Sequence, residues 1–120
     1  MEEGGKIRTI TVVKIPEGKL EEFKQYALEV MEIVKEKDTG TRRYDWFISS
    51  DGNECEVHEE FEDIKALMDH ARHVYRPGGW GDFMIDYGKV YSPIPQQYLD
   101  LLKDPKSPPV KFYSLFQGLG

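Results

Sequence analysis

The chain has 120 residues, of which 39% are hydrophobic and 32% are charged, and its formal net charge is −6. This length fits one folded domain, and no second domain is indicated along the chain. The negative charge argues against nucleic acid and anionic membranes as partners, since both bind basic protein surfaces. No apolar run reaches the roughly 20 residues of a membrane-crossing helix.

The first two predicted elements are a strand and a long helix. Residues 7–15 (IRTITVVKI) are rich in β-branched side chains and contain no Gly or Pro, which favours a strand. From Lys19 to Val34, apolar residues recur at helical spacing, so we expect an amphipathic helix with one buried face. Gly40 follows basic residues, which is typical of the end of a helix.

Residues 42–61 predict a β-hairpin. Asp51-Gly52 lies between two strand-like runs, and both residue types tolerate the positive φ of a tight turn. A two-residue loop there gives the hairpin one apolar face and one charged face, whereas a longer loop would shift the register. The predicted cross-strand pairs are Tyr44–Glu59, Trp46–Val57, Arg43–Glu60 and Asp45–His58.

The remaining elements are shorter. Asp63 is expected to cap a second helix that carries its own apolar stripe. The Gly- and Pro-rich residues 75–81 exclude a regular helix and a central strand. We predict a short helical turn at 83–85, a weak fourth strand at 86–91, a short helix at 96–103 and a last strand at 110–116.

The element order is therefore β-α-β-β-α-β, followed by a short helix and one more strand. The first six elements are the split-βαβ arrangement of the ferredoxin-like α+β fold, with both helices on one face of an antiparallel sheet. The other face needs a cover, and a second copy of the chain is the economical one, with the apolar last strand as a candidate contact. An interface on that face would have to pair its charged side chains. We predict one domain, residues 1–120, that forms a homodimer.

Cysteine usage and the N-terminus indicate the compartment. Cys55 is the only cysteine, so no internal disulfide can form, and on the apolar face of its strand an inert buried thiol is expected. The first residues, MEEGG, lack the basic start and apolar stretch of a signal peptide. The expected location is the cytoplasm.

A group of motifs resembles a known family. The frame Gly40-Thr41-x-x-Tyr44-x-Trp46-Phe47, the Asp-Gly turn, Glu59 late in the next strand and His70 in the following helix are similar to the antibiotic biosynthesis monooxygenase family of dimeric α+β barrels. The similarity covers a core of residues 7–73, and leaves a variable loop at 74–86 and a C-terminal helix and strand at 94–117. Members of this family oxygenate quinols or anthrone-like polyketides without metal or flavin, others degrade haem, and many have no assigned role. The resemblance implies no cofactor, a ligand between the helices and the sheet, and two sheets joined back to back.

The haem-degrading branch does not fit. It uses an Asn on the first strand, a Trp that ends the third strand and a His beyond the second helix. Here the first strand has no Asn, Phe61 stands in the place of the Trp, and His73 comes too early.

Glu59 is the strongest candidate for chemistry. On an apolar face beside Tyr44, desolvation disfavours its charged form and makes the carboxylate a better base for a phenolic proton. A deprotonated quinol can then pass an electron directly to oxygen. The structural alternative, which is common for buried acids, is that Glu59 accepts hydrogen bonds and fixes the core.

Aromatic and histidine side chains supply the other candidates. Tyr44 and Trp46 could hold a flat aromatic ligand, although buried rings at strand spacing are usually core. His70 flanks the apolar stripe of the second helix and could act as an acid or base near neutral pH. His73 lies nearly opposite the stripe and is expected to be solvated. The two histidines diverge and His58 belongs to the other sheet face, so no metal site is expected.

The segment 75–81 holds Arg76 and Trp80 among three glycines. It could form a lid in which glycines act as hinges, Trp80 covers the ligand and Arg76 binds an oxyanion. An ordinary surface loop has the same composition.

Two functions follow from these residues. The first is a cofactor-independent monooxygenase of a small electron-rich aromatic, with Glu59 or His70 removing a proton while Tyr44 and Trp46 hold the ring. The second is a non-catalytic homodimer that binds a small apolar molecule or serves a stress-related role on the same scaffold. Open space beside Glu59 favours the first, and space filled by Tyr44, Trp46 and Leu67 favours the second.

Overall fold

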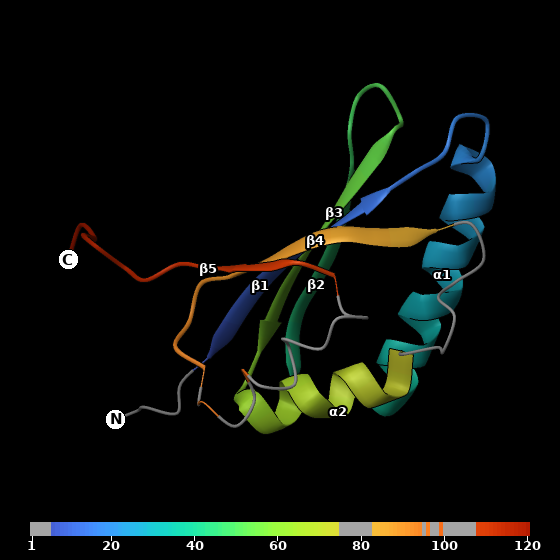
Figure 1. Cartoon of the computed structure of the whole chain (residues 1–120). Coiled ribbons are helices and arrows are strands. Elements are labelled where there is room, and N and C mark those ends of the chain that lie inside the picture. Colours follow the sequence, from blue (N-terminus) through green and yellow to red (C-terminus); the bar gives the residue numbers. More distant parts are fainter. Residues whose placement is uncertain (1–5, 75–82, 95, 97–98, 100–107) are drawn as a thin grey trace.

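The computed structural model describes residues 6–74, 83–94, 96, 99 and 108–120. Its elements are β1 (Ile7–Lys14), α1 (Leu20–Lys37), β2 (Thr41–Ile48), β3 (Glu54–Phe61), α2 (Ile64–Val74), β4 (Met84–Val90) and β5 (Val110–Phe112). The sheet order is β2-β3-β1-β4-β5, and only the β4–β5 pair is parallel. Both helices lie on one side of the sheet (Figure 1). The predicted ferredoxin-like fold is confirmed.

The β2–β3 hairpin keeps the predicted register although its loop is longer than predicted. All four expected cross-strand pairs are present. The last backbone hydrogen bond joins the Ser49 N–H to the Glu54 carbonyl at 2.8 Å, so residues 50–53 form the loop. This loop is symmetric about the Asp-Gly step, which leaves the register unshifted, and Gly52 has the positive φ of 75° that the turn requires.

The core lies between the helices and the sheet. Phe23 of α1 is fully buried, and its ring lies 5.2–5.8 Å from the rings of Tyr26, Trp46 and Phe83. Cys55 is buried on the sheet side, where burial raises the pKa of its thiol to about 11 and keeps it protonated at neutral pH. Within the described ranges, no helix has the length and apolar character needed to cross a bilayer.

Two predicted elements near the C-terminus are wrong in extent. The helical turn expected at 83–85 is absent, because β4 begins at Met84 and pairs with β1, so tertiary pairing overrides the local preference. The last strand ends at Phe112 instead of residue 116, since β4 itself ends at Val90 and offers no further partner. The expected loop at 75–81 and most of the expected helix at 96–103 lie outside the described residues.

Residues 113–120 form an apolar tail that leaves the sheet and extends away from the body of the molecule (Figure 1). Its start is anchored, since the ring of Tyr113 stacks on Tyr91 at 5.0 Å. Beyond that point Leu115 is 84% exposed, Phe116 is 96% exposed and Leu119 is fully exposed. The tail carries no charged side chain, so several large apolar groups lie in solvent.

Helix α2 rests directly on the chain just before β2. A Cβ added to Gly40 would lie 2.5 Å from the Cβ of Ala66 in α2, which is closer than carbon atoms approach. Asp63 caps the helix as predicted, because its Oδ1 accepts the Ala66 N–H at 2.9 Å. The bare backbone at Gly40 thus lets the first turn of α2 dock and brings His70, one turn later, near the end of α1.

Candidate active site

Glu59 is buried on the helix-facing side of β3, with its side chain 10% exposed. Its Oε1 accepts hydrogen bonds from the hydroxyls of Thr9 at 2.6 Å and Thr11 at 2.9 Å, both on β1. Its Oε2 lies 3.5 Å from Nε2 of His70. The carboxylate is therefore withdrawn from bulk water and accepts two hydroxyl hydrogen bonds from β1.

His70 packs between two aromatic rings and two carboxylates. Its side chain is 6% exposed, and the rings of Tyr44 and Phe61 lie 5.0 and 5.1 Å from the imidazole. Its Nδ1 lies 2.7 Å from Oδ2 of Asp38. Burial opposes a charge on this ring, but the carboxylates of Glu59 and Asp38 outweigh burial and raise the pKa of His70 above its ordinary value of 6.5.

Asp38 is a site residue that the sequence reasoning missed. It caps the C-terminal end of α1, its side chain is 3% exposed, and its Oδ2 also accepts the Thr41 hydroxyl at 2.6 Å. Burial alone would raise its pKa, but hydrogen bonds from Thr41, His73 and His70 lower the pKa below the ordinary 3.8. One signal could have found it: an acid at the C-terminal end of a helix opposes the helix dipole, so it needs partners elsewhere.

His73 is not solvated as predicted. Its Nδ1 lies 2.6 Å from Oδ1 of Asp38 and its side chain is only 26% exposed. His70 and His73 were expected to diverge, yet both reach the same carboxylate, because Asp38 lies between them at the end of α1. Among the described residues, no group of three or more His, Cys, Asp or Glu side chains has the arrangement of a metal site.

Tyr44 and Trp46 have different surroundings. Tyr44 contacts the His70 ring, and burial together with the charge of Glu59 raises the pKa of its hydroxyl well above 10, so it remains a hydrogen-bond donor. Trp46 packs against Phe23 in the core. Its Nε1 is buried and has no aligned acceptor within the described part of the chain, although Tyr44 lies close to it. Tyr44 therefore belongs to the Glu59 cluster, whereas the ring of Trp46 belongs mainly to the core.

The sheet surface beside Glu59 is bare toward β4. Gly88 lies opposite Thr11, so this position carries no side chain on the helix-facing side. A Cβ added to Gly88 would lie 3.7 Å from the Ile10 carbonyl oxygen and 4.0 Å from Val110, and no closer described atom is present. An added Cβ would therefore be in ordinary van der Waals contact with the β1 backbone and Val110. The two remaining predicted site residues, Arg76 and Trp80, lie outside the described residues.

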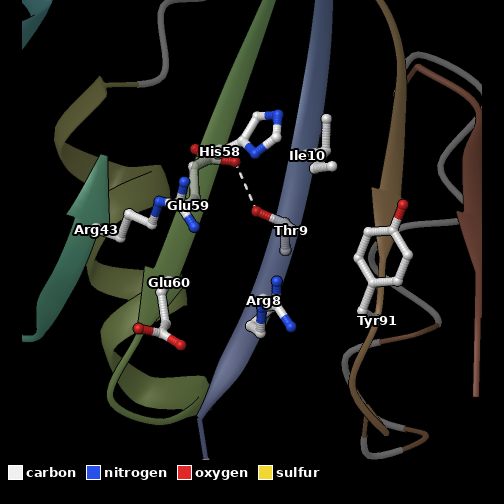
Figure 2. A pocket seen from close by; sticks show the side chains of 8 residues that line it. All are labelled: Arg8, Thr9, Ile10, Arg43, His58, Glu59, Glu60 and Tyr91. Atoms are coloured by element: carbon white, nitrogen blue, oxygen red, sulfur yellow. Dashed lines mark hydrogen bonds between the residues drawn. The ribbon is translucent and has the colours of Figure 1, made fainter. Parts of the chain in front are cut away.

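Among the described residues, a small hollow lies on the opposite face of the sheet. Figure 2 shows it with Arg8, Arg43 and Glu60 around it, and Thr9 and Glu59 also line it. Its volume of about 20 Å³ holds roughly one water molecule. Arg43 pairs with Asp45 at 2.6 Å and His58 with its strand neighbour Glu56 at 2.9 Å. Much of the charge on this face is thus paired within the chain, and the hollow is too small for a ring.

Comparison with known proteins places these features in context. A family model described as antibiotic biosynthesis monooxygenase matches residues 7–75. The structure of MupZ from Pseudomonas fluorescens has 22% identity and a TM-score of 0.74, over 100% of this chain and 92% of that chain. Rv0793 from Mycobacterium tuberculosis has 19% identity and a TM-score of 0.54, over 77% of this chain and 98% of that chain. No curated protein matches in sequence. At these identities the two structures show a shared fold alone.

Proposed function

Because the chain belongs to the antibiotic biosynthesis monooxygenase family, we propose that it is a cofactor-independent monooxygenase of a small electron-rich aromatic, such as a quinol or an anthrone-like compound. The observation that carries this proposal is the buried Glu59 carboxylate beside the His70 imidazole. A base and an acid in contact, away from water, are what proton removal from a weakly acidic substrate needs.

The reaction balances without a cofactor. A base takes one proton from the substrate, and the resulting anion passes an electron to O₂. Recombination forms a carbon–oxygen bond, protonation gives a hydroperoxide, and loss of water leaves a carbonyl. The sum is one substrate and one O₂ converted to one oxygenated product and one H₂O. Glu59 and His70 supply the proton transfers, and the Tyr44 hydroxyl is available to donate a hydrogen bond to a substrate oxygen.

The geometry favours this function over the non-catalytic alternative. Core packing accounts for Trp46, but it does not account for two buried carboxylates and a buried histidine in one cluster. Apolar side chains of similar volume would serve a scaffold as well or better, because burying charges costs desolvation energy.

Oxygen uptake with a panel of quinols and anthrones tests the function. The purified protein, treated with a chelator, is expected to consume one O₂ per substrate. Under ¹⁸O₂, one labelled atom is expected in the product and one in water. The absence of uptake across the panel contradicts the oxygenase function and favours the binding protein, which equilibrium binding of the same compounds would then detect.

We also propose that the protein forms a homodimer through the helix-free face of the sheet together with the apolar tail 113–120. Phe47 is half exposed on that face, and Leu115 and Phe116 are exposed in the tail. The described residues of a single copy leave these groups exposed, whereas two copies related by a two-fold axis can cover each other.

Charge in the tail is expected to break this dimer. The double variant Leu115→Glu/Phe116→Glu should shift the mass measured by light scattering from two chains toward one, since carboxylates resist burial. Leu28→Glu is the matched control, because Leu28 is 63% exposed on α1, and it should remain dimeric. A monomeric wild type, or dissociation of both variants alike, contradicts the proposed interface.

A further inference from the structure

His70 presents both of its ring nitrogens to carboxylates. Nδ1 lies 2.7 Å from Oδ2 of Asp38, and Nε2 lies 3.5 Å from Oε2 of Glu59. A neutral imidazole carries a single N–H, so one nitrogen would direct a lone pair at an anion. Only the doubly protonated ring donates toward both carboxylates, and it is therefore the form that fits this geometry.

Asp38 is held firmly enough to orient that ring. Its Oδ2 accepts the Thr41 hydroxyl at 2.6 Å, and its Oδ1 lies 2.6 Å from Nδ1 of His73. These partners come from β2 and α2, so three elements meet at one buried carboxylate. A carboxylate held in this way also sets the orientation of the histidine ring that donates a hydrogen bond to it. Carboxylates and carbonyls that accept the second N–H of a functional imidazole act in the same way.

We propose that Asp38 is the positioning residue of the site: it holds His70 as an imidazolium whose Nε2–H is directed at Glu59, so that Glu59 is the base and His70 the acid. The division of roles rests on the proposed oxygenase function, whereas the charge of the ring does not. Two other titratable groups face His70 within the described residues. Tyr44 stays neutral because its pKa is raised, and His73 shares the Asp38 carboxylate.

The assignment closes the proton balance. The substrate gives its proton to Glu59 and its electrons to O₂, and the peroxide anion takes the Nε2 proton of His70. Water then leaves as the carbonyl forms. The proton on Glu59 crosses the 3.5 Å gap to Nε2 of His70, and both groups return to their starting states. The Nδ1 proton stays on the His70 ring, hydrogen-bonded to Asp38, throughout. The ring therefore releases and takes up a proton at Nε2 only.

Nitrogen-15 NMR of the histidine rings in the full-length protein tests the charge state without any substrate. Both nitrogens of wild-type His70 are expected to show predominantly protonated shifts at pH 6.5, where an ordinary histidine is half neutral, because its pKa is raised. In Asp38→Asn the pKa of the ring should fall and a larger neutral fraction should appear at that pH, since the amide offers no negative charge and Glu59 alone then opposes burial. In Asp69→Asn, the same chemical change placed on α2 beside His70, the ring should stay protonated, because Asp69 pairs with Lys65 and Arg72 instead. A neutral His70 in the wild type overturns the proposal even where Asp38→Asn fails to fold.

The pH dependence of turnover tests the role of Asp38. Activity should fall as the pH rises through the pKa of His70, because the acid is lost. In Asp38→Asn this alkaline limb should move lower by about one unit, which is a tenfold change in kcat on the limb, with little change in KM. Turnover with an unmoved limb overturns the positioning role while the oxygenase function stands. Absence of turnover contradicts the oxygenase function, and the NMR result alone then decides whether Asp38 holds the imidazolium.

Discussion

Glu59→Gln is expected to lower kcat for oxygen uptake by about 10²–10⁴-fold, the range that general base catalysis contributes. Glutamine has nearly the same shape, and its amide oxygen can still accept the hydroxyls of Thr9 and Thr11. The amide cannot take a proton at neutral pH, so binding should survive while chemistry is lost. KM is therefore expected to change by about threefold or less. Initial rates of oxygen uptake, measured with an oxygen electrode at several substrate concentrations, give both constants.

Glu60→Gln is the matched control for that result. Glu60 is the next residue on β3, lies on the opposite face of the sheet and borders the small hollow of Figure 2. Its replacement makes the same chemical change without touching the cluster, and kcat should stay within about twofold. Equal losses in the two variants, or full activity in Glu59→Gln, would remove Glu59 from the reaction.

Asp38→Ala is expected to lower the free energy of unfolding by about 3–5 kcal/mol, the cost of removing one partner of a buried ion pair. The change leaves His70 and His73 near each other without the carboxylate that both contact. Asp69→Ala should leave the free energy of unfolding nearly unchanged, because its ion pairs with Lys65 and Arg72 are on the exposed side of α2. Urea unfolding followed by circular dichroism measures both variants.

The loss in Asp38→Ala should depend on pH in a definite way. The pKa of His70 is raised on folding, so its stabilisation is full below 6.5 and is lost as the pH rises through the folded value. The pKa of Asp38 is lowered, so its stabilisation is full above 3.8 and is lost as the pH falls through the folded value. The difference between wild type and variant should be largest between these two pH values. A difference that is flat with pH would contradict the ion pair.

The hairpin was predictable because its signals are local. Alternation with a period of two assigns each side chain to a face, and the Asp-Gly step marks the centre of the reversal. The loop has four residues instead of two, but its centre is the same, so the pair Tyr44–Glu59 and the inward direction of Glu59 follow. Pattern alone therefore positions one half of the candidate site.

The other half depends on how α2 crosses the end of α1. His70 and His73 lie 32 and 35 residues from Asp38 in sequence, and no periodicity relates these positions. Helical spacing gives the direction of His73 relative to its own helix, which indicated solvent, but it does not indicate what another element brings to that side. The sequence reasoning was wrong about His73 and missed Asp38 for this one reason.

The close approach of α2 to Gly40 has a consequence for any search for functional positions. A mutational scan scored by activity would mark residue 40 as strongly as a reactive group, although it carries no functional atom. A methyl group there would push against Ala66 and tilt away the turn that bears His70, so acid and base would separate while each remained intact. Second-site changes that restore such a variant should be found at Ala66, as Gly, and not among the polar residues themselves.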